Sequence, residues 1–368
     1  MSDVDLELTA PTTRPVAAQH EFDRERLAGF LRERVGAFSG AVAVEQFAGG
    51  QSNPTYLVGA GSDRYVLRRK PPGTLLPSAH AVDREYRVMH ALAASGVPVP
   101  KVFALCDDPG VIGTEFFLME YVPGRVFWDA TLPGVAPSER SALYDELNRV
   151  IAALHGVDHA AVGLVDYGRP GDYLRRQIAR WTRQYRAAAT EPIEAMERLI
   201  EWLPENVPAS DETTIVHGDF RIDNVIFHPS EPRILAVLDW ELSTLGHPLA
   251  DFAYHAMTWR VTADEFRGIK GVDLASLGIP DEAAYVAAYC ARTGREAIDD
   301  WDYYLAFNMF RMAAILQGIL ARAIQGNATS SEAVATGRRA RPMAAAGWRL
   351  VEGLSAGPTA TAAGAVRP

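Results

Sequence analysis

A short stretch in the middle of the chain gathers side chains that could carry out phosphoryl transfer. The loop HGDFRIDN lies between two apolar runs and places Asp219, Arg221 and Asn224 near one another. Asp239 follows at the end of the apolar run 234–238. Phosphoryl transfer needs oxygen ligands for Mg²⁺, a carboxylate that orients the attacking hydroxyl and a cation on the transferred group. These four residues supply all of them.

Each residue type suggests one role in that reaction. Asp219 could orient the attacking hydroxyl, and Arg221 is a cation for the transferred phosphoryl group. Asn224 and Asp239 are the expected ligands of Mg²⁺. The structural alternative is a polar turn followed by a cap at the end of a strand.

Two further interpretations concern the histidines of this region. His217 by itself is expected to brace the loop through backbone hydrogen bonds. A metal-hydrolase interpretation would use four ligands for a transition metal, namely His217, Asp219, His228 and Asp239. No H-x-x-x-H or H-E-x-x-H pair supports that interpretation.

The elements that must position the loop fall into two regions of different periodicity. Before residue 122, strand-forming runs are expected over 42–47, 56–58, 64–69, 102–106 and 115–121, with helices over 22–36 and 79–94. After Pro123, helical spacing dominates over 138–155, 172–189, 192–203, 281–292 and 300–325. A compact β element, over 213–216, 225–227 and 234–238, interrupts these helices. The chemistry-bearing loop lies at its strand ends.

The composition indicates a folded globular chain, and its length suggests two to three units or one large bilobal fold. Of 368 residues, 48% are hydrophobic and 22% are charged, as in ordinary globular proteins. We expect a mobile terminus over 1–21, a β-rich lobe over 22–122, a mainly helical lobe over 123–354 and a mobile terminus over 355–368. The net charge of −10 argues against nucleic acid and anionic membranes as partners.

Localisation follows from what the sequence offers for export and oxidation. Cys106 and Cys290 are the two cysteines, too few for a disulfide framework, which favours a reducing compartment. The N-terminus has early acids and no basic segment followed by an apolar one, so no export signal is expected. The apolar runs fall short of the roughly 20 residues of a membrane span. We therefore expect a cytoplasmic protein with no membrane segment.

The pattern H-G-D-x-x-x-x-N, followed by a strand that ends in D-W-E, resembles the aminoglycoside phosphotransferase family. This family includes choline and homoserine kinase relatives. The resemblance implies an α+β, bilobal protein-kinase-like fold, with a small β-rich N-lobe and a larger, mainly helical C-lobe. It also implies ATP and Mg²⁺ as cofactors, with Asp219, Asn224 and Asp239 at the kinase spacing. Trp240-Glu241 stands where kinases carry Phe-Gly.

The first lobe carries the family's other features in order. The run FAGGQSN resembles the loop over the nucleotide phosphates, which implies nucleotide contacts for Gly50, Gln51, Ser52 and Asn53. Arg68 occupies the position at which the family carries a phosphate-binding lysine. Glu85 occupies the position of the helix residue that pairs with that lysine. The stretch 116–122 resembles the family's hinge, the segment between the two lobes. This implies that backbone groups near Glu120 and Val122 contact adenine. The two glycines alone are also typical of a hairpin turn, and GTP in place of ATP stays open.

The acceptor is indicated by a closer resemblance. The stretches 67–80 and 238–246 resemble the kinase domain fused to acyl-CoA dehydrogenase in some eukaryotic proteins and its stand-alone bacterial relatives. This implies a hydroxyacyl-CoA acceptor, notably a 4-hydroxyacyl-CoA. Independently, residues 169–186 contain six arginines and one aspartate, and one helical stripe holds Arg176, Arg180 and Arg183. Such a stripe could receive the phosphates of CoA, although a solvated helix face is the ordinary alternative.

Other acceptor contacts and functions stay open at this point. Glu241, Asp251 and Tyr254 are candidates for the acceptor site, and Asp251 is equally a brace for the loop after Asp239. A kinase of another small alcohol, such as an aminoglycoside or an amino alcohol, is the first alternative. A non-catalytic nucleotide-binding scaffold is the second, because an arginine replaces the usual lysine at position 68. The oligomeric state is not indicated.

Overall fold

The computed structural model describes residues 12–35, 41–47, 53–61, 63–71, 81–326 and 332–355. The chain divides into two compact units. The first consists of Met1–Arg169, Thr213–Asp251 and Asp273–Glu296, and the second of Pro170–Glu212, Phe252–Val272 and Ala297–Pro368. In this division the β-rich region and the loop around Asp219 belong to one unit. The expected lobe boundary between residues 122 and 123 therefore differs from the observed units and stays a prediction.

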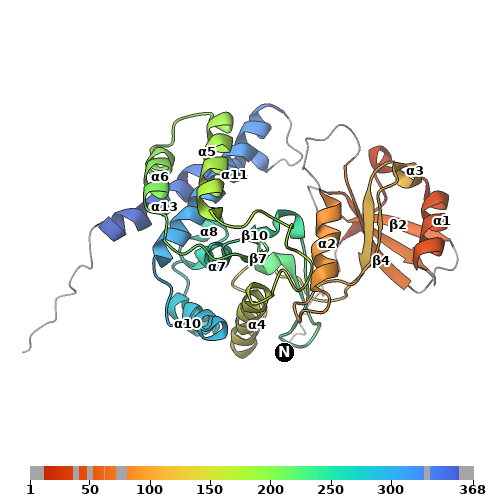
Figure 1. The fold of residues 1–368 in the computed structure, drawn as a ribbon, viewed down its shortest axis with the longest axis horizontal. Coiled ribbons are helices and arrows are strands. Elements are labelled where there is room, and N and C mark those ends of the chain that lie inside the picture. Colours follow the sequence, from red (N-terminus) through yellow and green to blue (C-terminus); the bar gives the residue numbers. More distant parts are fainter. Residues whose placement is uncertain are drawn as a thin grey trace, which may run out of the picture. The chain divides into compact units, whose positions relative to one another are not determined.

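The first unit contains a six-stranded antiparallel sheet in the order β1-β2-β3-β4-β6-β5 (Figure 1). Its strands are β1 (Thr13–Arg14), β2 (Val42–Phe47), β3 (Thr55–Ala60), β4 (Asp63–Arg69), β5 (Val102–Cys106) and β6 (Phe116–Glu120). Five strands were expected, and these five lie close to the predicted ranges. The sixth is β1, whose residues Thr13 and Arg14 pair with Phe47 and Gln46.

Residues 12–21 are thus part of the fold, whereas the sequence placed them in a mobile terminus. Besides β1, they include a 3-10 turn, Ala18–His20, and Val16 is buried in the core beside the sheet. An edge strand pairs through its backbone, so its side chains need not show the alternation by which strands are recognised in a sequence. That is why the Pro- and Thr-rich composition was misleading here. Residues 1–11 lie outside the described residues.

Helices cover both faces of the sheet, with α2 on one side and α1 and α3 on the other (Figure 1). They span α1 (Arg24–Val35), α2 (Val82–Leu92) and α3 (Pro109–Ile112). Because side chains alternate along a strand, Leu67 and Arg69 of β4 face α1, and Arg68 between them faces α2. As a result, Arg68 lies on the same side of the sheet as its acidic partner Glu85.

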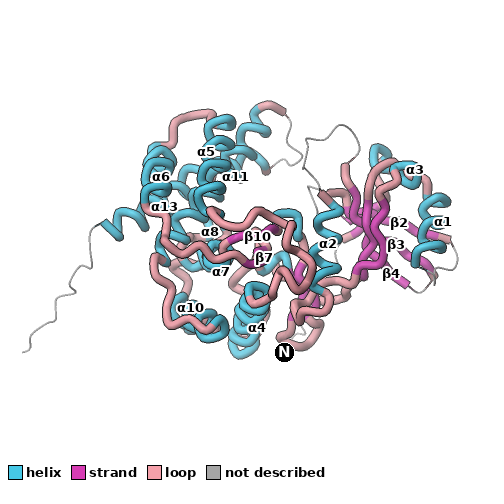
Figure 2. The backbone as a smooth tube through the Cα atoms, in the orientation of Figure 1, coloured by secondary structure: helices cyan, strands magenta, loops and turns pink. Residues whose placement is uncertain are grey.

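Two small sheets and several helices complete the first unit. The strand β7 (Thr214–Val216) pairs with β10 (Thr244–Gly246), and β8 (Val225–Phe227) pairs with β9 (Ile234–Val237). Figure 2 draws β7 and β10 as a short pair of strands in magenta. The helices are α4 (Pro137–His155), α9 (Leu274–Leu277) and α10 (Glu282–Thr293), and α7 (Pro248–Ala256) runs from the first unit into the second.

The second unit is helical in its described residues. It contains α5 (Tyr173–Ala188), α6 (Glu194–Glu205), α8 (Ala263–Phe266), α11 (Trp301–Ile324), α12 (Ala333–Arg338) and α13 (Ala340–Ser355). The central helix α11 packs against α5, α6, α12 and α13. By length and composition, α11 is the one described helix that could span a membrane, but 78% of the relevant window is buried inside the protein. This is the burial of a core helix.

Candidate active site

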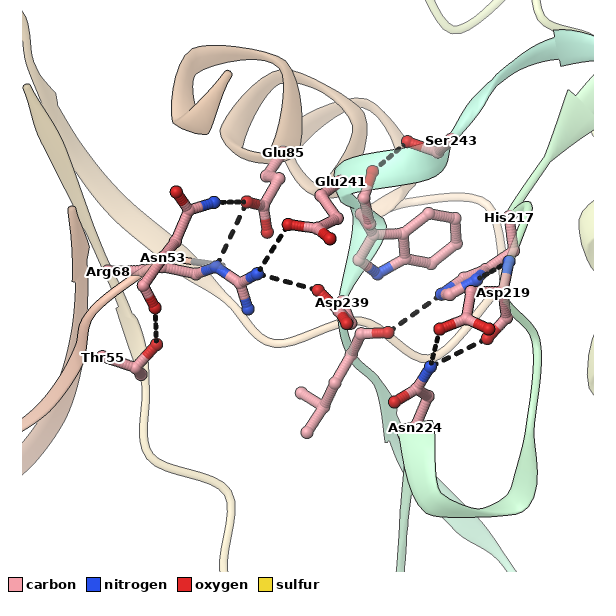
Figure 3. A network of polar contacts seen from close by, with 12 residues as sticks. Asn53, Thr55, Arg68, Glu85, His217, Asp219, Asn224, Asp239, Glu241 and Ser243 are labelled. Carbon is pink, nitrogen blue, oxygen red and sulfur yellow. Dashed lines mark hydrogen bonds and ion pairs between the residues drawn. The ribbon is translucent and has the colours of Figure 1, made fainter. Parts of the chain in front are cut away.

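The loop after β7 fixes the carboxylate of Asp219. The side-chain amide of Asn224 donates from Nδ2 to the Asp219 backbone oxygen at 2.8 Å and to its Oδ2 at 3.0 Å (Figure 3). A 3-10 turn over Ile222–Asn224 brings the two residues together across the loop. Since the NH₂ group of Asn224 is used in this way, the amide's Oδ1 is the oxygen that remains to serve as a metal ligand.

The buried carboxylate of Asp251 accepts hydrogen bonds from the backbone of this loop. Its Oδ2 accepts from the backbone N–H of His217 at 2.8 Å, and its Oδ1 accepts from that of Gly218 at 2.8 Å. Nε2 of His155 lies 3.2 Å from the same Oδ2, and Nδ1 of His155 lies 2.7 Å from the Tyr289 hydroxyl. Burial would raise the pKa of Asp251, but the hydrogen bond and charge of His155, with those of His217, outweigh it and lower that pKa.

Asp251 therefore braces the loop that carries Asp219. Of the two roles left open by the sequence, bracing is the one that this burial favours, although the braced residues are His217 and Gly218 rather than the loop after Asp239. Gly218 has φ +83°, and a Cβ there would lie 2.8 Å from the carbonyl oxygen of Leu242. Both the positive φ and the close approach of Leu242 therefore exclude a side chain at position 218.

His217 braces the loop as expected. Its Nδ1 accepts from the backbone N–H of Asp219 at 3.1 Å, so Nε2 carries the proton and donates to the carbonyl of Leu238 at 2.9 Å. Both ring nitrogens have backbone partners, which leaves none for a metal. Among the described residues, no group of three or more His, Cys, Asp or Glu side chains could hold a metal ion. The metal-hydrolase interpretation thus finds no support.

Asp239 follows β9 in a left-handed backbone conformation, with φ 65° and ψ 56°. Aspartate tolerates this region better than most residues, and such strain is common at functional sites. The backbone N–H of Leu238 donates to the carbonyl of Asn224 at 2.8 Å. This bond ties the segment carrying Asp239 to the segment carrying Asn224. Mg²⁺ is commonly held by one or two protein oxygens together with phosphate and water, and these two side chains fit that requirement.

Arg68 lies among three carboxylates (Figure 3). Its Nε is 3.1 Å from Oε1 of Glu85, and Nη2 is 2.7 Å from Oδ1 of Asp239 and 3.6 Å from Oε2 of Glu241. Asn53 donates from Nδ2 to the same Oε1 of Glu85 at 3.0 Å. The pairing of Arg68 with Glu85 is the one expected. Glu241 was expected at an acceptor, but the 3-10 turn Trp240–Leu242 directs it toward Arg68 instead.

The charge of this cluster is unbalanced, since one guanidinium faces three acids. Burial raises the pKa of Glu85 to about 7; Arg68 counters this, and the charges of Asp239 and Glu241 add to it. A cation held by Asp239 and the amide oxygen of Asn224 would reduce this repulsion, and carboxylate and amide oxygens are donors that suit Mg²⁺.

Arg221 lies beside the acid that it was expected to assist. Its Nε is 3.2 Å from Oδ1 of Asp219, and Nη2 is 3.2 Å from Oδ2 of Asp223. Its role on the γ-phosphate stays a prediction. Asp223 was not singled out in the sequence.

Of the remaining residues predicted to contact the nucleotide, only some belong to the described part of the chain. Gly50, Gln51 and Ser52 lie outside the described residues. Glu120, the last residue of β6, donates its backbone N–H to the carbonyl of Lys101 at 2.8 Å, so that donor is already used. Val122 follows two residues later and is half-buried. The hinge contacts to adenine stay predictions.

The other acceptor candidates lie in the second unit. Arg180 and Arg183 are exposed on α5 and Arg176 is half-buried, while the apolar stripe of this helix is buried as expected. Tyr254 is buried, with the guanidinium of Arg311 5.1 Å from its ring centre. Tyr254 is therefore part of the interior of this unit.

Comparisons with known proteins identify the family and the fold of this chain. A sequence model described as "Phosphotransferase enzyme family" matches residues 43–307. Acyl-CoA dehydrogenase family member 10 of Mus musculus is 48% identical over 346 residues, which is 93% of this chain and 32% of that protein. The chain spans less than half the length of the curated relatives that it matches.

Solved structures extend the likeness to the fold. The crystal structure of a proposed aminoglycoside phosphotransferase from Ralstonia eutropha is 55% identical, with a TM-score of 0.84, over 90% of this chain and 99% of that one. An aminoglycoside phosphotransferase in ternary complex with ADP and hygromycin B is 18% identical, with a TM-score of 0.56, over 87% of this chain and 98% of that one. The chain therefore belongs to the phosphotransferase enzyme family and has its protein-kinase-like fold.

Proposed function

We propose that this chain transfers the γ-phosphate of ATP to a hydroxyl group of a small molecule, and that this molecule is a hydroxyacyl-CoA. One observation carries the first part of the proposal. Asp219, Asn224 and Asp239 are joined by direct hydrogen bonds between their segments, and Asp239 is paired with Arg68 of the sheet. This is the set of oxygen ligands, carboxylate and cation that phosphoryl transfer requires.

The residues would act mainly by position and charge. The Asp219 carboxylate, held by the amide of Asn224, accepts the hydrogen bond of the acceptor hydroxyl and aims its oxygen at the γ-phosphate. Arg68, steadied by Glu85, holds the other phosphates. Mg²⁺, held by Asn224 and Asp239, would neutralise the charge of the phosphates when bound.

Two observations support an acyl-CoA acceptor. The curated relatives with 40–48% identity are named as acyl-CoA dehydrogenase proteins, and this chain matches a part of each. The arginine-rich face of α5 offers positive charge in an acidic chain, and arginine binds phosphate in a bidentate manner. A neutral or cationic acceptor has no need of such a face.

A second candidate is a kinase of another small alcohol, including an amino sugar. The naming of the Ralstonia eutropha protein, at 55% identity, favours it. The two candidates differ in the charge of the acceptor, because an amino sugar is cationic and a CoA thioester is strongly anionic. That difference allows a direct test.

The test is mass spectrometry of reactions containing MgATP and one acceptor at a time. The panel contains a 4-hydroxyacyl-CoA, the matching free 4-hydroxy acid, an aminoglycoside and an amino alcohol. We expect a phosphorylated product from the CoA thioester and little from the free acid, which has the same hydroxyl without the CoA phosphates. Phosphorylation of the aminoglycoside alone would support the second candidate and contradict the first.

A further inference from the structure

Helix α2, which carries Glu85, is attached to the segment that follows Asp239 through a neighbouring arginine. Nη2 of Arg84 donates to the carbonyl of Tyr167 at 2.6 Å and lies 3.4 Å from the carbonyl of Ser243. The same guanidinium lies over the ring of Tyr167, 4.2 Å from its centre. Arg84 therefore contacts two chain segments that are distant in the sequence from α2.

The hydroxyl of Tyr167 closes the third side of this arrangement. It lies 2.6 Å from Oγ of Ser243 and 3.2 Å from the carbonyl of Arg84. Oγ of Ser243 also lies 2.5 Å from the carbonyl of Trp240, so the two hydroxyls connect Tyr167, Ser243 and these backbone carbonyls. Burial raises the pKa of Tyr167 to about 12, and the phenol therefore keeps its proton across the physiological range.

Close backbone packing supports the same contact. Tyr167 and Ser243 are both buried. A Cβ on Gly168 would lie 2.4 Å from Oγ1 of Thr244 and 2.6 Å from the backbone nitrogen of Leu245. The segment at 167–168 thus approaches β10 more closely than a side chain at 168 would allow.

The start of α2 has no capping side chain. Its N-cap residue, Ala81, makes no side-chain capping hydrogen bond, although capping is a usual way to fix a helix start. Glu85 lies in the first turn of α2 and pairs with Arg68. A contact from Arg84, one residue away, can therefore determine where Glu85 is held.

We propose that Arg84, Tyr167 and Ser243 form a clamp that positions helix α2 against the turn 240–243, so that Glu85 and Asp239 hold Arg68 ready for the nucleotide. These three are positioning residues, since they act through Glu85 and Arg68. The inference rests on the proposed function for its effect on ATP. The clamp itself consists of contacts within the first unit.

The test removes the phenol hydroxyl with Tyr167→Phe and, from the other side of the bond, the serine hydroxyl with Ser243→Ala. The matched control is Tyr144→Phe, because Tyr144 is also buried and donates to a backbone carbonyl, that of Ala130, at 2.5 Å. Hydrogen exchange followed by mass spectrometry measures the opening of residues 82–92 and 240–246. Calorimetry measures the affinity for MgADP.

We expect both clamp variants to exchange faster in these two segments and to bind MgADP about fivefold more weakly, as the loss of one buried hydrogen bond implies. Tyr144→Phe should change neither. Exchange and affinity equal to wild type in either folded clamp variant would overturn the clamp. If wild type itself bound no nucleotide, the proposed function would fail, and the exchange measurement alone would still decide whether the clamp exists.

Discussion

Replacing Asp251 by asparagine should weaken both the fold and the reaction. The carboxylate is buried, and each of its oxygens accepts a backbone N–H of the catalytic loop. Asparagine has nearly the same shape but only one acceptor oxygen. Its NH₂ group would face one of those two N–H donors, leaving that donor without a partner and removing the negative charge next to His155.

The magnitude follows from these contacts. A buried donor left without a partner costs about 1–3 kcal/mol, and a hydrogen bond to a charged group contributes about 1.5–3 kcal/mol. Since one neutral hydrogen bond is retained, we expect the free energy of unfolding to fall by about 2–4 kcal/mol. The turnover number should fall as well, because His217 and Gly218 directly precede Asp219. Loss of the brace would misplace that carboxylate.

The effect should depend on pH in a defined direction. The pKa of Asp251 is lower in the folded protein than its ordinary value, so its contribution is present above that ordinary value, about 4. It is lost as the pH falls through the folded value. The difference in melting temperature between wild type and Asp251→Asn should therefore be constant above about pH 5 and shrink below about pH 4.

The assay combines thermal melting from pH 3 to 8 with steady-state kinetics at neutral pH. Asp281→Asn is the matched control, since Asp281 is an exposed N-cap that accepts from the backbone N–H of Ala284 at 2.8 Å, and asparagine caps equally well. Wild-type melting and turnover in Asp251→Asn would refute the bracing role.

Three further predictions concern the site and the acceptor. Asp239→Ala should remove most of the Mg²⁺ dependence of ADP binding in calorimetry; titrations that match wild type with and without Mg²⁺ would exclude it as a ligand. Arg68→Met should weaken MgADP binding about 10- to 100-fold, as expected for a lost charge-assisted hydrogen bond, and an unchanged affinity would show that it does not hold phosphate. Replacing Arg180 and Arg183 together by serine should raise KM for the CoA thioester several-fold without changing KM for the free hydroxy acid. An equal rise for both acceptors would argue against CoA recognition by α5.

Much of the site could be predicted from the sequence because its residues are concentrated in one loop. Asp219 and Asn224 are five positions apart, and the chain between them is a single turn, so their contact is a local property. The strands β2 and β8 match the expected ranges because alternation and β-branched residues mark them clearly. Asp239 was found through the apolar strand that precedes it.

What escaped prediction depends on contacts between distant segments. Asp251 contacts His155 of α4, which in turn contacts Tyr289 of α10, and a histidine at a helix end gives no sign of its partners in the sequence. The clamp likewise joins Arg84, Tyr167 and Ser243 over more than seventy positions. Glu241 was assigned to the acceptor because nothing in the sequence shows which way a turn after a strand directs its side chain.

The most direct test of the central claim separates nucleotide binding from transfer in Asp219→Asn. Phosphorylated product from MgATP and the best acceptor of the panel is measured by mass spectrometry, and MgADP affinity by calorimetry on the same preparation. We expect product formation to be lost while MgADP affinity stays within about twofold of wild type, since in the proposed function Asp219 orients the hydroxyl and does not hold the nucleotide. Product formed at the wild-type rate by Asp219→Asn would contradict this expectation.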